Sequence, residues 1–262
     1  MNLSDLLNRS NRSNMDCRIV EVGTAHTGPW NMACDEWLLE SALRTGQATV
    51  RVYAWSRPTV SLGYFQQPDS LDDSPLVEGL DRVHRLSGGG AIVHHFEWTY
   101  SCVVPPQDTR NSRGLPLYAR IHQALVDQIS ACSGQEIPEL GLRGHVAQHD
   151  QPALCFARAA DEDVICKGHK VLGSAQRRRR GAILQHGSLL LHQSPHAPEF
   201  PGLLDLVAGL TLPEDFPETM ARAISESLQW QAALEPLSES ERTEIEGLAA
   251  GNLAGLRTRS GS

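Results

Sequence analysis

Short segments in which apolar and polar residues alternate recur along the chain, and this period of two predicts β-strands. The clearest is Val50–Trp55, and Thr59–Leu62 follows it across Arg57-Pro58 as its predicted neighbour. Cys17–Val22 also alternates, and we interpret it as an edge strand. Further strands are predicted at Arg82–Ser87, Ala91–His94 and Trp98–Val104.

Apolar residues at helical spacing predict helices around these strands. Asn31 can cap the first helix and Gly46 can close it, while Asp35 and Glu36 favour its positive end. The second follows Pro116, and its apolar face is formed by Tyr118, Ile121, Leu125 and Ile129. Three later helical segments are predicted at Phe200–Leu210, Glu218–Leu228 and Leu237–Leu248.

A β-hairpin is predicted at 164–172. Two runs that favour strands flank Lys167-Gly168, a two-residue connection that ends in glycine. Gly173-Ser174-Ala175 then places three small residues after the second strand, which leaves room for a large ligand or a closely approaching backbone. Arg177–Arg180 form a predicted basic turn before an apolar strand at Ala182–Leu191.

Composition excludes several classes of protein. The 262 residues are 40% hydrophobic and 21% charged, as in ordinary globular domains. A net charge of −8 argues against nucleic acid as the main partner. Six cysteines without paired spacing indicate a reduced cytoplasmic protein, and no apolar run is long enough for a membrane span or a secretory signal. We expect one mixed α/β domain over 16–250, a disordered tail over 1–15 and a flexible tail over 251–262.

A glycine-rich loop follows the predicted strand that ends near residue 87. Three consecutive glycines, Gly88-Gly89-Gly90, allow positive φ and expose backbone N–H groups to an anion or a carbonyl oxygen. No Gly-Lys-Ser/Thr follows, so the segment is not a Walker loop. Arg85 before the glycines and His94 after them favour a binding loop over a merely flexible one.

These motifs resemble, in order, those of the lipoate and biotin protein ligase superfamily. Arg85, Ser87, the three glycines, Ala91 and His94 match its R-x-S/T-G-G-G-A-x-x-H loop. The other matching segments are Asn31-Met32-Ala33 with Asp35-Glu36, Pro58–Gln66, Glu97 with Thr99-Tyr100-Ser101, Gly168 with Lys170, Gly173–Gln176, and Leu184–Ser188. The resemblance covers residues 17–192. It implies an α+β fold with a mixed, largely antiparallel central sheet flanked by helices.

Within the superfamily, Cys155-Phe156 resembles the nucleophile segment of the cysteine-dependent octanoyltransferases (the LipM type). The other octanoyltransferase branch carries its cysteine directly after an Arg-Gly pair, and here Ala182 follows Arg180-Gly181. Lipoate ligases generally carry an additional carboxy-terminal domain, for which the tail here is too short. His84 and His95 depart from the common Arg and Asp of the family, which affects detail of the glycine-loop face.

The resemblance implies octanoyl transfer from acyl carrier protein to a lysine of a lipoyl-domain protein, such as the glycine cleavage H protein, through an acyl-Cys155 intermediate. A thioester is already activated, so no cofactor and no metal are expected. Lys170 is the predicted catalytic partner, because a positive charge about 4 Å from a thiolate contributes roughly 4 kcal/mol at an effective dielectric of 20. Alternatively, its ammonium stabilises negative charge that develops on the thioester oxygen. The predicted substrate-binding residues are Arg85, Ser87, Gly88, Gly89, Gly90, His94, Gly173, Ser174, Ala175, Gln176, His186 and Gly187.

Other functions remain open on the sequence. Octanoyl transfer between two lipoyl-domain proteins would use the same residues. An ATP-dependent lipoate–protein ligase, which would need ATP and Mg²⁺, would hold an acyl-adenylate with the glycine loop and Lys170. A non-catalytic lipoyl-domain-binding or zinc module is the third alternative, with His145, His149 and Cys155 as candidate zinc ligands. Arg177–Arg180 are an exposed turn that could also steer an acidic carrier protein.

Overall fold

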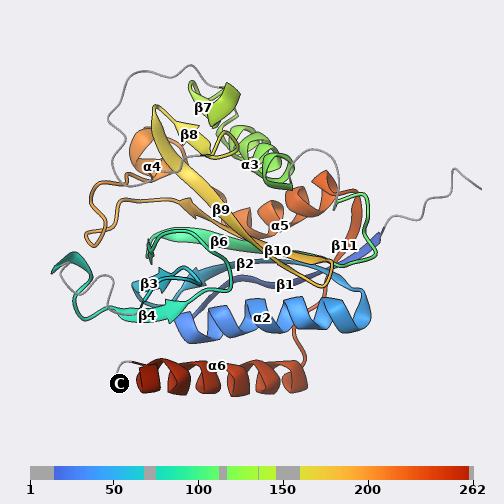
Figure 1. Ribbon diagram of the computed structural model, residues 1–262. Coiled ribbons are helices and arrows are strands. Elements are labelled where there is room, and N and C mark those ends of the chain that lie inside the picture. Colours follow the sequence, from blue (N-terminus) through green and yellow to red (C-terminus); the bar gives the residue numbers. More distant parts are fainter. Residues whose placement is uncertain (1–14, 68–74, 112–116, 135, 146–159, 260–262) are drawn as a thin grey trace, which may run out of the picture.

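A computed structural model describes residues 15–67, 75–111, 117–134, 136–145 and 160–259 (Figure 1). An eight-stranded sheet has the order β11-β1-β2-β6-β10-β9-β8-β7, and a three-stranded sheet has the order β4-β3-β5. In the large sheet β1 pairs in parallel with both β2 and β11, whereas the other pairs are antiparallel. The predicted α+β class with a largely antiparallel central sheet is therefore confirmed.

The strands of the two sheets and the helices have the following bounds. The large sheet contains β1 Met15–His26, β2 Ala48–Trp55, β6 Glu97–Val104, β7 Leu140–Leu142, β8 Val164–Cys166, β9 His169–Arg179, β10 Ala182–Leu190 and β11 Trp230–Leu234. The small sheet contains β3 Thr59–Leu62, β4 Asp81–His84 and β5 Ile92–His94. The helices are α2 Gly28–Thr45, α3 Leu117–Ser133, α4 Leu203–Leu206, α5 Phe216–Ser227 and α6 Glu239–Arg259, with short 3₁₀ turns at Pro75–Val77 and Arg143–His145.

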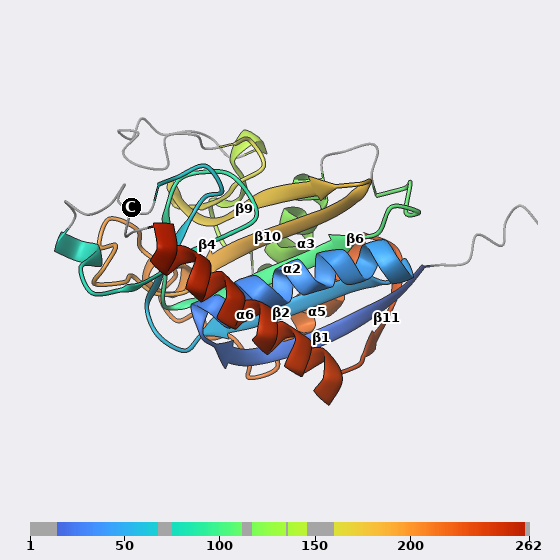
Figure 2. The ribbon, with the colours of Figure 1, turned by 60° about the horizontal axis from the view of Figure 1, so that its bottom comes forward.

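Helices cover both faces of the large sheet. Helices α3 and α5 pack on one face, and α2 packs on the other, with α6 outside α2 (Figures 1 and 2). Arg18 of β1 holds α6 in place through two hydrogen bonds to the Glu241 carboxylate, and the Trp37 indole donates to Glu244 at 2.7 Å. Three layers result, with a helix pair stacked on one side.

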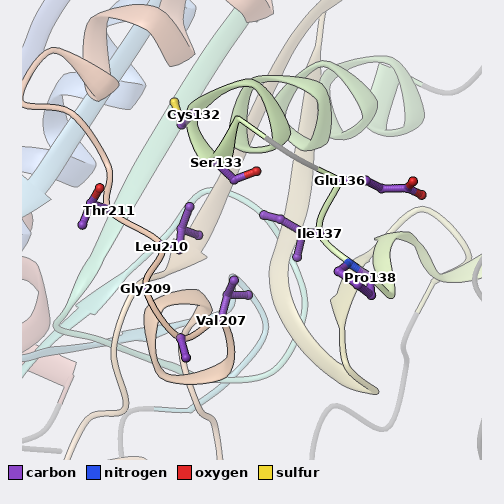
Figure 3. Close-up of a pocket in the computed structure, with 10 residues that line it drawn as sticks. Cys132, Ser133, Glu136, Ile137, Pro138, Val207, Gly209, Leu210 and Thr211 are labelled. Carbon is purple, nitrogen blue, oxygen red and sulfur yellow. The ribbon is translucent and has the colours of Figure 1, made fainter.

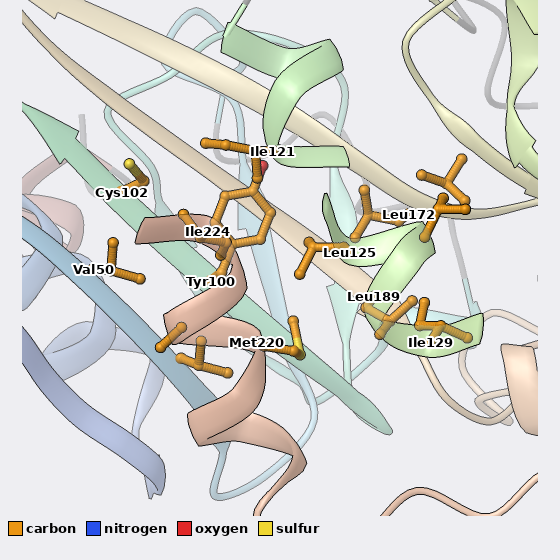
Figure 4. Packing of buried hydrophobic residues seen from close by; sticks show 14 of the residues in the cluster. Val50, Tyr100, Cys102, Ile121, Leu125, Ile129, Leu172, Leu189, Met220 and Ile224 are labelled. Atoms are coloured by element: carbon orange, nitrogen blue, oxygen red, sulfur yellow. The ribbon is translucent and has the colours of Figure 1, made fainter. Parts of the chain in front are cut away.

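The larger hydrophobic core lies between the sheet and helices α3 and α5 (Figure 4). Ile121, Leu125 and Ile129 recur at helical spacing and are buried against Tyr100 and Leu189. Each fully buried aliphatic side chain of this size contributes about 1.5–3 kcal/mol. The predicted apolar face of α3 is thus confirmed, and it belongs to the same core cluster as Tyr100 of β6 and Leu189 of β10.

The hairpin prediction is also confirmed. Lys167 and Gly168 adopt φ values of 47° and 80°, and two left-handed residues suit a tight hairpin turn. The prediction of a basic turn at Arg177–Arg180 was partly wrong, because β9 continues through Arg179. The next turn is formed by Arg180 and Gly181, both with positive φ.

The start of the first helix differs from the prediction. Helix α2 begins at Gly28, with Thr27 as N-cap and a proline in its first turn, a position that suits proline because its missing N–H costs nothing there. Asn31 lies inside the helix and is buried, where its amide donates to the carbonyls of His26 and Ala54. Gly46 ends the helix in a left-handed conformation, as predicted.

The positions of the strands were predicted better than the partners with which they pair. Cys17–Val22 is not an edge strand, because β11, which the sequence analysis assigned to no element, pairs along it. Thr59–Leu62 pairs with β4 and β5 in the small sheet and not with β2. Alternation of apolar and polar residues predicts a strand, but it carries no information about which strand pairs with it.

The chain ends also differ from their predicted bounds. Met15, placed in the predicted tail, pairs with Trp230 in β1, and residues 1–14 lie outside the described residues. Helix α6 continues to Arg259 across most of the predicted flexible tail. The helix predicted at Phe200–Leu210 is shorter, since α4 covers Leu203–Leu206 alone.

Candidate active site

Several of the predicted site residues lie at or beside the centre of β10. His186, Gly187 and Ser188 pair there with Ala175, Ser174 and Gly173 of β9. Because side chains alternate along a strand, β10 presents polar groups to both faces of the sheet. The polar groups on one face of the sheet contact the glycine loop, and those on the opposite face contact α3.

Arg85 holds the glycine loop from within. Its guanidinium donates to the carbonyls of Gly88 and Gly90 at 2.9 and 2.6 Å, and to that of Ser61 at 2.9 Å. The side chain is buried, and this burial lowers the pKa of Arg85 to about 10. Gly89 has a φ of 97°, so the loop uses the conformational freedom predicted for it.

His94 supports the loop from the small sheet. Its Nε2 lies 2.7 Å from the Ser61 hydroxyl, and its Nδ1 donates to the Glu97 carboxylate at 2.7 Å. The ring stacks on Trp55 with centroids 3.9 Å apart. Burial acts to raise the pKa of Glu97, but the charge and hydrogen bond of His94 and the Thr99 hydroxyl outweigh it, and the pKa is lowered. The carboxylate therefore stays ionised and fixes the His94 ring.

Ser87, at the start of the loop, is tied to β10 through His186. The Ser87 hydroxyl lies 2.5 Å from His186 Nε2, and His186 Nδ1 donates to Asp35 at 3.1 Å. Asp35 also accepts from Arg51 at 3.1 Å and from Tyr53 at 3.2 Å. The serine–histidine–aspartate order is that of hydrolase triads, but the Ser87 residue is 1% exposed, and the buried charges link α2, β2, β10 and the loop.

Asp35 anchors this cluster. Burial acts to raise the pKa of Asp35, but the hydrogen bond from His186 and the charge of Arg51 outweigh it, and the pKa lies below its ordinary value. The Arg51 guanidinium stacks 3.7 Å from the Tyr53 ring centroid. Both partners of this ion pair are buried, which makes each dependent on the other.

Lys170 is held in a partly buried ion pair. Its Nζ lies 2.7 Å from Asp163 Oδ2, and the same carboxylate accepts the backbone N–H of Ala160. Burial raises the pKa of Asp163, although the charge of Lys170 acts in the opposite direction. A Cβ atom at Gly173 would lie 2.3 Å from Lys170 Cε, so the absence of a side chain there makes room for the lysine itself. Gly173 was predicted to leave room for a ligand, and the structure gives this further reason for the glycine.

On the α3 side, Ser174 lies in a second polar group. The Ser174 hydroxyl is 2.6 Å from His122 Nε2 and 2.7 Å from the Tyr100 hydroxyl. Gln185 donates to Tyr100 at 2.6 Å and accepts from Gln176 at 2.8 Å. A Cβ atom at Gly187 would lie 2.0 Å from Ser174 Oγ, so only glycine at this position leaves room for the Ser174 hydroxyl.

Gly173→Val should disable the site more than the fold. Overpacking costs about 1–3 kcal/mol of stability, whereas displacement of the Lys170 ammonium should lower any activity that depends on it by about 100-fold. The measurements are the urea unfolding curve and the rate of acyl transfer. Gly247→Val is the matched control, because a Cβ at this exposed helical position meets nothing within 4 Å. Near-normal activity of Gly173→Val would contradict the placement of Lys170.

His122 makes part of the stability depend on pH. Burial, with a smaller contribution from the charge of Lys170, lowers the pKa of His122 to about 4, so the folded protein binds this proton much more weakly than the unfolded chain does. The free energy of unfolding therefore keeps the full contribution of neutral His122 above pH 6.5. Between pH 6.5 and 4 it falls by about 1.4 kcal/mol per pH unit, because the unfolded chain binds the proton and the folded protein does not. His122→Phe should flatten this part of the pH profile of urea unfolding relative to the wild type. An unchanged slope would contradict a buried neutral His122.

Several predicted residues lie outside the described residues. Cys155 and His149 fall within 146–159, and no side-chain contacts are described for His145, so neither the nucleophile nor the zinc alternative is located. Within the described part of the chain, no group of three or more His, Cys, Asp or Glu residues could hold a metal ion. The described helices also include none that is long and apolar enough to cross a membrane.

The sequence analysis missed Asp163 and His122 as members of the site. Asp163 stands just before β8 and resembled any other acidic loop residue. His122 gave a usable signal, because it falls on the apolar face of α3 next to Ile121 and is nevertheless polar. A polar residue at a core position of a helix often marks a buried network.

A separate pocket of about 310 Å³ lies between the end of α3 and the segment after α4 (Figure 3). Its lining includes Cys132, Ile137, Pro138, Val207 and Leu210. None of the predicted site residues lines it, so we assign it no part in the chemistry.

Lipoate protein ligases are among the solved structures that share this fold. A bipartite lipoate protein ligase from Thermoplasma acidophilum, studied with its E2 lipoyl domain, superposes with a TM-score of 0.66 at 19% identity over 90% of this chain and 92% of that chain. A lipoate-protein ligase A bound with ATP gives a TM-score of 0.64 at 20% identity over 90% of this chain and 95% of that chain. These similarities define the class of fold.

Sequence relatives identify the family. Octanoyltransferase LipM of Moorella thermoacetica is 40% identical over 66% of this chain and 64% of its own length. The enzyme of the same name from Kyrpidia tusciae is 33% identical over 87% of this chain and 95% of its own length. The Lipoyl protein ligase A/B catalytic domain family matches residues 28–200. The chain belongs to this family, which confirms the superfamily resemblance.

Proposed function

We propose that the protein is an octanoyltransferase that moves an octanoyl group from acyl carrier protein to a lysine of a lipoyl-domain protein. The relatives named octanoyltransferase LipM support this activity. The observation that carries the proposal is the Lys170 ammonium, fixed 2.7 Å from Asp163 above Gly173, where an acyl thioester could be polarised.

In the proposed reaction the Cys155 thiolate attacks the thioester carbon of the carrier. The carbon–sulfur bond of the thioester breaks, the carrier leaves as a thiolate that takes up a proton from water, and the octanoyl group remains on Cys155. The acceptor lysine amine then attacks this carbon, loses a proton and forms the amide, and the Cys155 thiolate is released. In both steps negative charge develops on the acyl oxygen, and the Lys170 ammonium is the proposed stabilising cation.

No cofactor or metal is needed in this scheme, because the thioester is already activated. ATP and Mg²⁺ would be required only by the ligase alternative. We place the reaction in the cytoplasm, since a catalytic thiol must stay reduced.

The surface beside the glycine loop is suited to protein substrates. The Tyr64 backbone N–H donates to the Ser87 carbonyl, the Tyr64 ring contacts the Phe65 ring edge to face, and Arg177 lies 4.7 Å from the Tyr64 ring centroid. Phe65 is 82% exposed and Tyr64 is 49% exposed, so two adjacent aromatic side chains face solvent here. Exposed aromatic and arginine side chains of this kind are common at interfaces.

Charge reversal at the end of the β9–β10 hairpin should weaken carrier binding without stopping the chemistry. Arg178 and Arg180 are exposed, and basic side chains steer an acidic partner. The Arg178→Glu, Arg180→Glu double variant should raise KM for octanoyl carrier protein by about tenfold at low salt, with kcat unchanged. Arg222→Glu, on α5, is the control. An unchanged KM would exclude the hairpin as a docking site.

Transfer between two lipoyl-domain proteins remains a second candidate, because one neighbouring ligase was solved together with an E2 lipoyl domain. The deciding experiment is intact-mass spectrometry of the protein after incubation, without ATP, with octanoyl carrier protein or with an octanoylated lipoyl domain. We expect an octanoyl adduct with the carrier donor. An adduct with the lipoyl-domain donor alone would favour the second candidate.

A further inference from the structure

A chain of hydrogen bonds on the α3 side of β10 has a direction that one carbonyl group fixes. His122 Nδ1 lies 2.5 Å from the Glu162 carbonyl oxygen, which can only accept, so Nδ1 carries the hydrogen. Burial keeps the His122 ring neutral at ordinary pH, so Nε2 is an acceptor. The Ser174 hydroxyl must therefore donate to His122.

The direction passes on through each further group. The single hydroxyl hydrogen of Ser174 is donated to His122, so the Ser174 oxygen accepts a hydrogen bond from the Tyr100 hydroxyl at 2.7 Å. Tyr100 in turn can only accept from Gln185, and Gln185 accepts from Gln176. Burial raises the pKa of Tyr100, which keeps its hydroxyl protonated. One donor and one acceptor at each step leave a single consistent arrangement.

The chain ends at the backbone that carries the partner of Lys170. Glu162 directly precedes Asp163, whose carboxylate binds the Lys170 ammonium. The His122 side chain is fully buried beneath this segment, at 0% exposure for the residue. Its hydrogen bond to the Glu162 carbonyl is thus a tether between α3 and the loop that presents Asp163.

We propose that His122 is a positioning residue for Lys170, which it acts on through the Glu162–Asp163 segment. His122 donates to the Glu162 carbonyl and accepts from Ser174, and so holds Asp163 where its carboxylate binds the Lys170 ammonium above Gly173. The importance of this position for catalysis rests on the proposed function. The tether between His122 and the Glu162 carbonyl does not depend on the proposed function, and its effect on Lys170 can be measured without any substrate.

The lysine content of the chain makes that measurement direct. The sequence contains only two lysines, Lys167 and Lys170. Lys167, whose Nζ donates to the Leu206 carbonyl, is the internal reference. The folded protein is acetylated with limiting acetic anhydride, denatured, and then acetylated fully with the deuterated reagent. Trypsin then cuts only at arginine, and fragment ions of peptide 159–177 give the labelling of each lysine separately.

His122→Phe should raise the labelling of Lys170 relative to Lys167 by about fivefold, the change expected for loss of one buried hydrogen bond of ordinary strength. His122→Asn should restore a ratio close to wild type, because its amide nitrogen lies near the Nδ1 position and can donate to Glu162. Val126→Ala, a packing change on the same helix, should leave the ratio unchanged. Ser174→Ala should raise the ratio less than His122→Phe does, and it serves if His122→Phe fails to fold.

Kinetics provide a second readout. His122→Phe should lower kcat for octanoyl transfer by about fivefold or more with KM for the octanoyl carrier unchanged, and His122→Asn should recover most of this loss. An unchanged labelling ratio in folded His122→Phe, or in Ser174→Ala if the former does not fold, would overturn the proposal. A changed ratio in a protein whose wild type transfers no octanoyl group would uphold the tether and reject the proposed function.

Discussion

Cys155→Ala should abolish octanoyl transfer, and Lys170→Ala should slow it by about 100- to 1,000-fold, because the first removes the proposed nucleophile and the second removes one stabilising cation. Cys155→Ala should form no octanoyl adduct, whereas Lys170→Ala should form it slowly. Lys170→Arg should not restore the rate, since a planar guanidinium does not occupy the position of an ammonium. The measurement is intact-mass spectrometry of enzyme and acceptor over time, in the absence of ATP.

Cys132→Ala is the matched control, since Cys132 is a partly exposed thiol on α3 that is not among the predicted site residues. It should transfer octanoyl groups at the wild-type rate. A ligase would give the opposite order, with Cys155→Ala nearly silent, Lys170 indispensable and turnover dependent on ATP. Full modification of the acceptor by Cys155→Ala would therefore reject the covalent mechanism.

Asp35→Ala should destabilise the protein by about 3–5 kcal/mol, because it leaves the buried Arg51 guanidinium without its carboxylate. Arg51 and Asp35 are both buried, and no solvent is available to replace the lost partner. The same change frees His186, and through it Ser87, so activity per folded molecule should also fall. Urea unfolding monitored by circular dichroism gives the first effect, and rates corrected for the folded fraction give the second.

Glu36→Ala, at the next position of the same helix but only half-buried, is the control and should change stability by less than about 0.5 kcal/mol. A loss below about 1 kcal/mol for Asp35→Ala would mean that Arg51 finds another partner on relaxation. In that case the cluster would not be the anchor of the glycine loop.

Local chemistry in the sequence predicted the parts of the site that lie on single elements. The glycine loop needed positive φ, and Gly89 has it; the Lys167-Gly168 turn needed two left-handed residues, and both are present. Period-two and helical spacing likewise located β2, β6, β10 and α3 to within a few residues. Such features depend on neighbours along the chain, so one sequence is enough to find them.

The parts that were missed depend on contacts between distant segments. Asp35 was interpreted as a charge at a helix end, yet it is buried because Arg51 and His186 reach it from two strands. Asp163 and His122 acquire their places only when α3 packs over β9. A polar side chain gives no sign of its partner until the tertiary structure brings the two together, so the sequence could supply the groups but not their pairing.

The parallel pairing of β1 with β11 has a consequence for how the chain is made. During synthesis β2 is available to β1 almost at once, whereas β11 leaves the ribosome only after residue 230. Until then the edge of β1 from Met15 to Ile19 stays open, and an open strand edge is a template for association with other chains. Changes that weaken β11, or the Arg18 hydrogen bonds to the Glu235 and Pro236 carbonyls that follow it, should therefore lower the yield of folded protein far more than they lower the rate of each folded molecule.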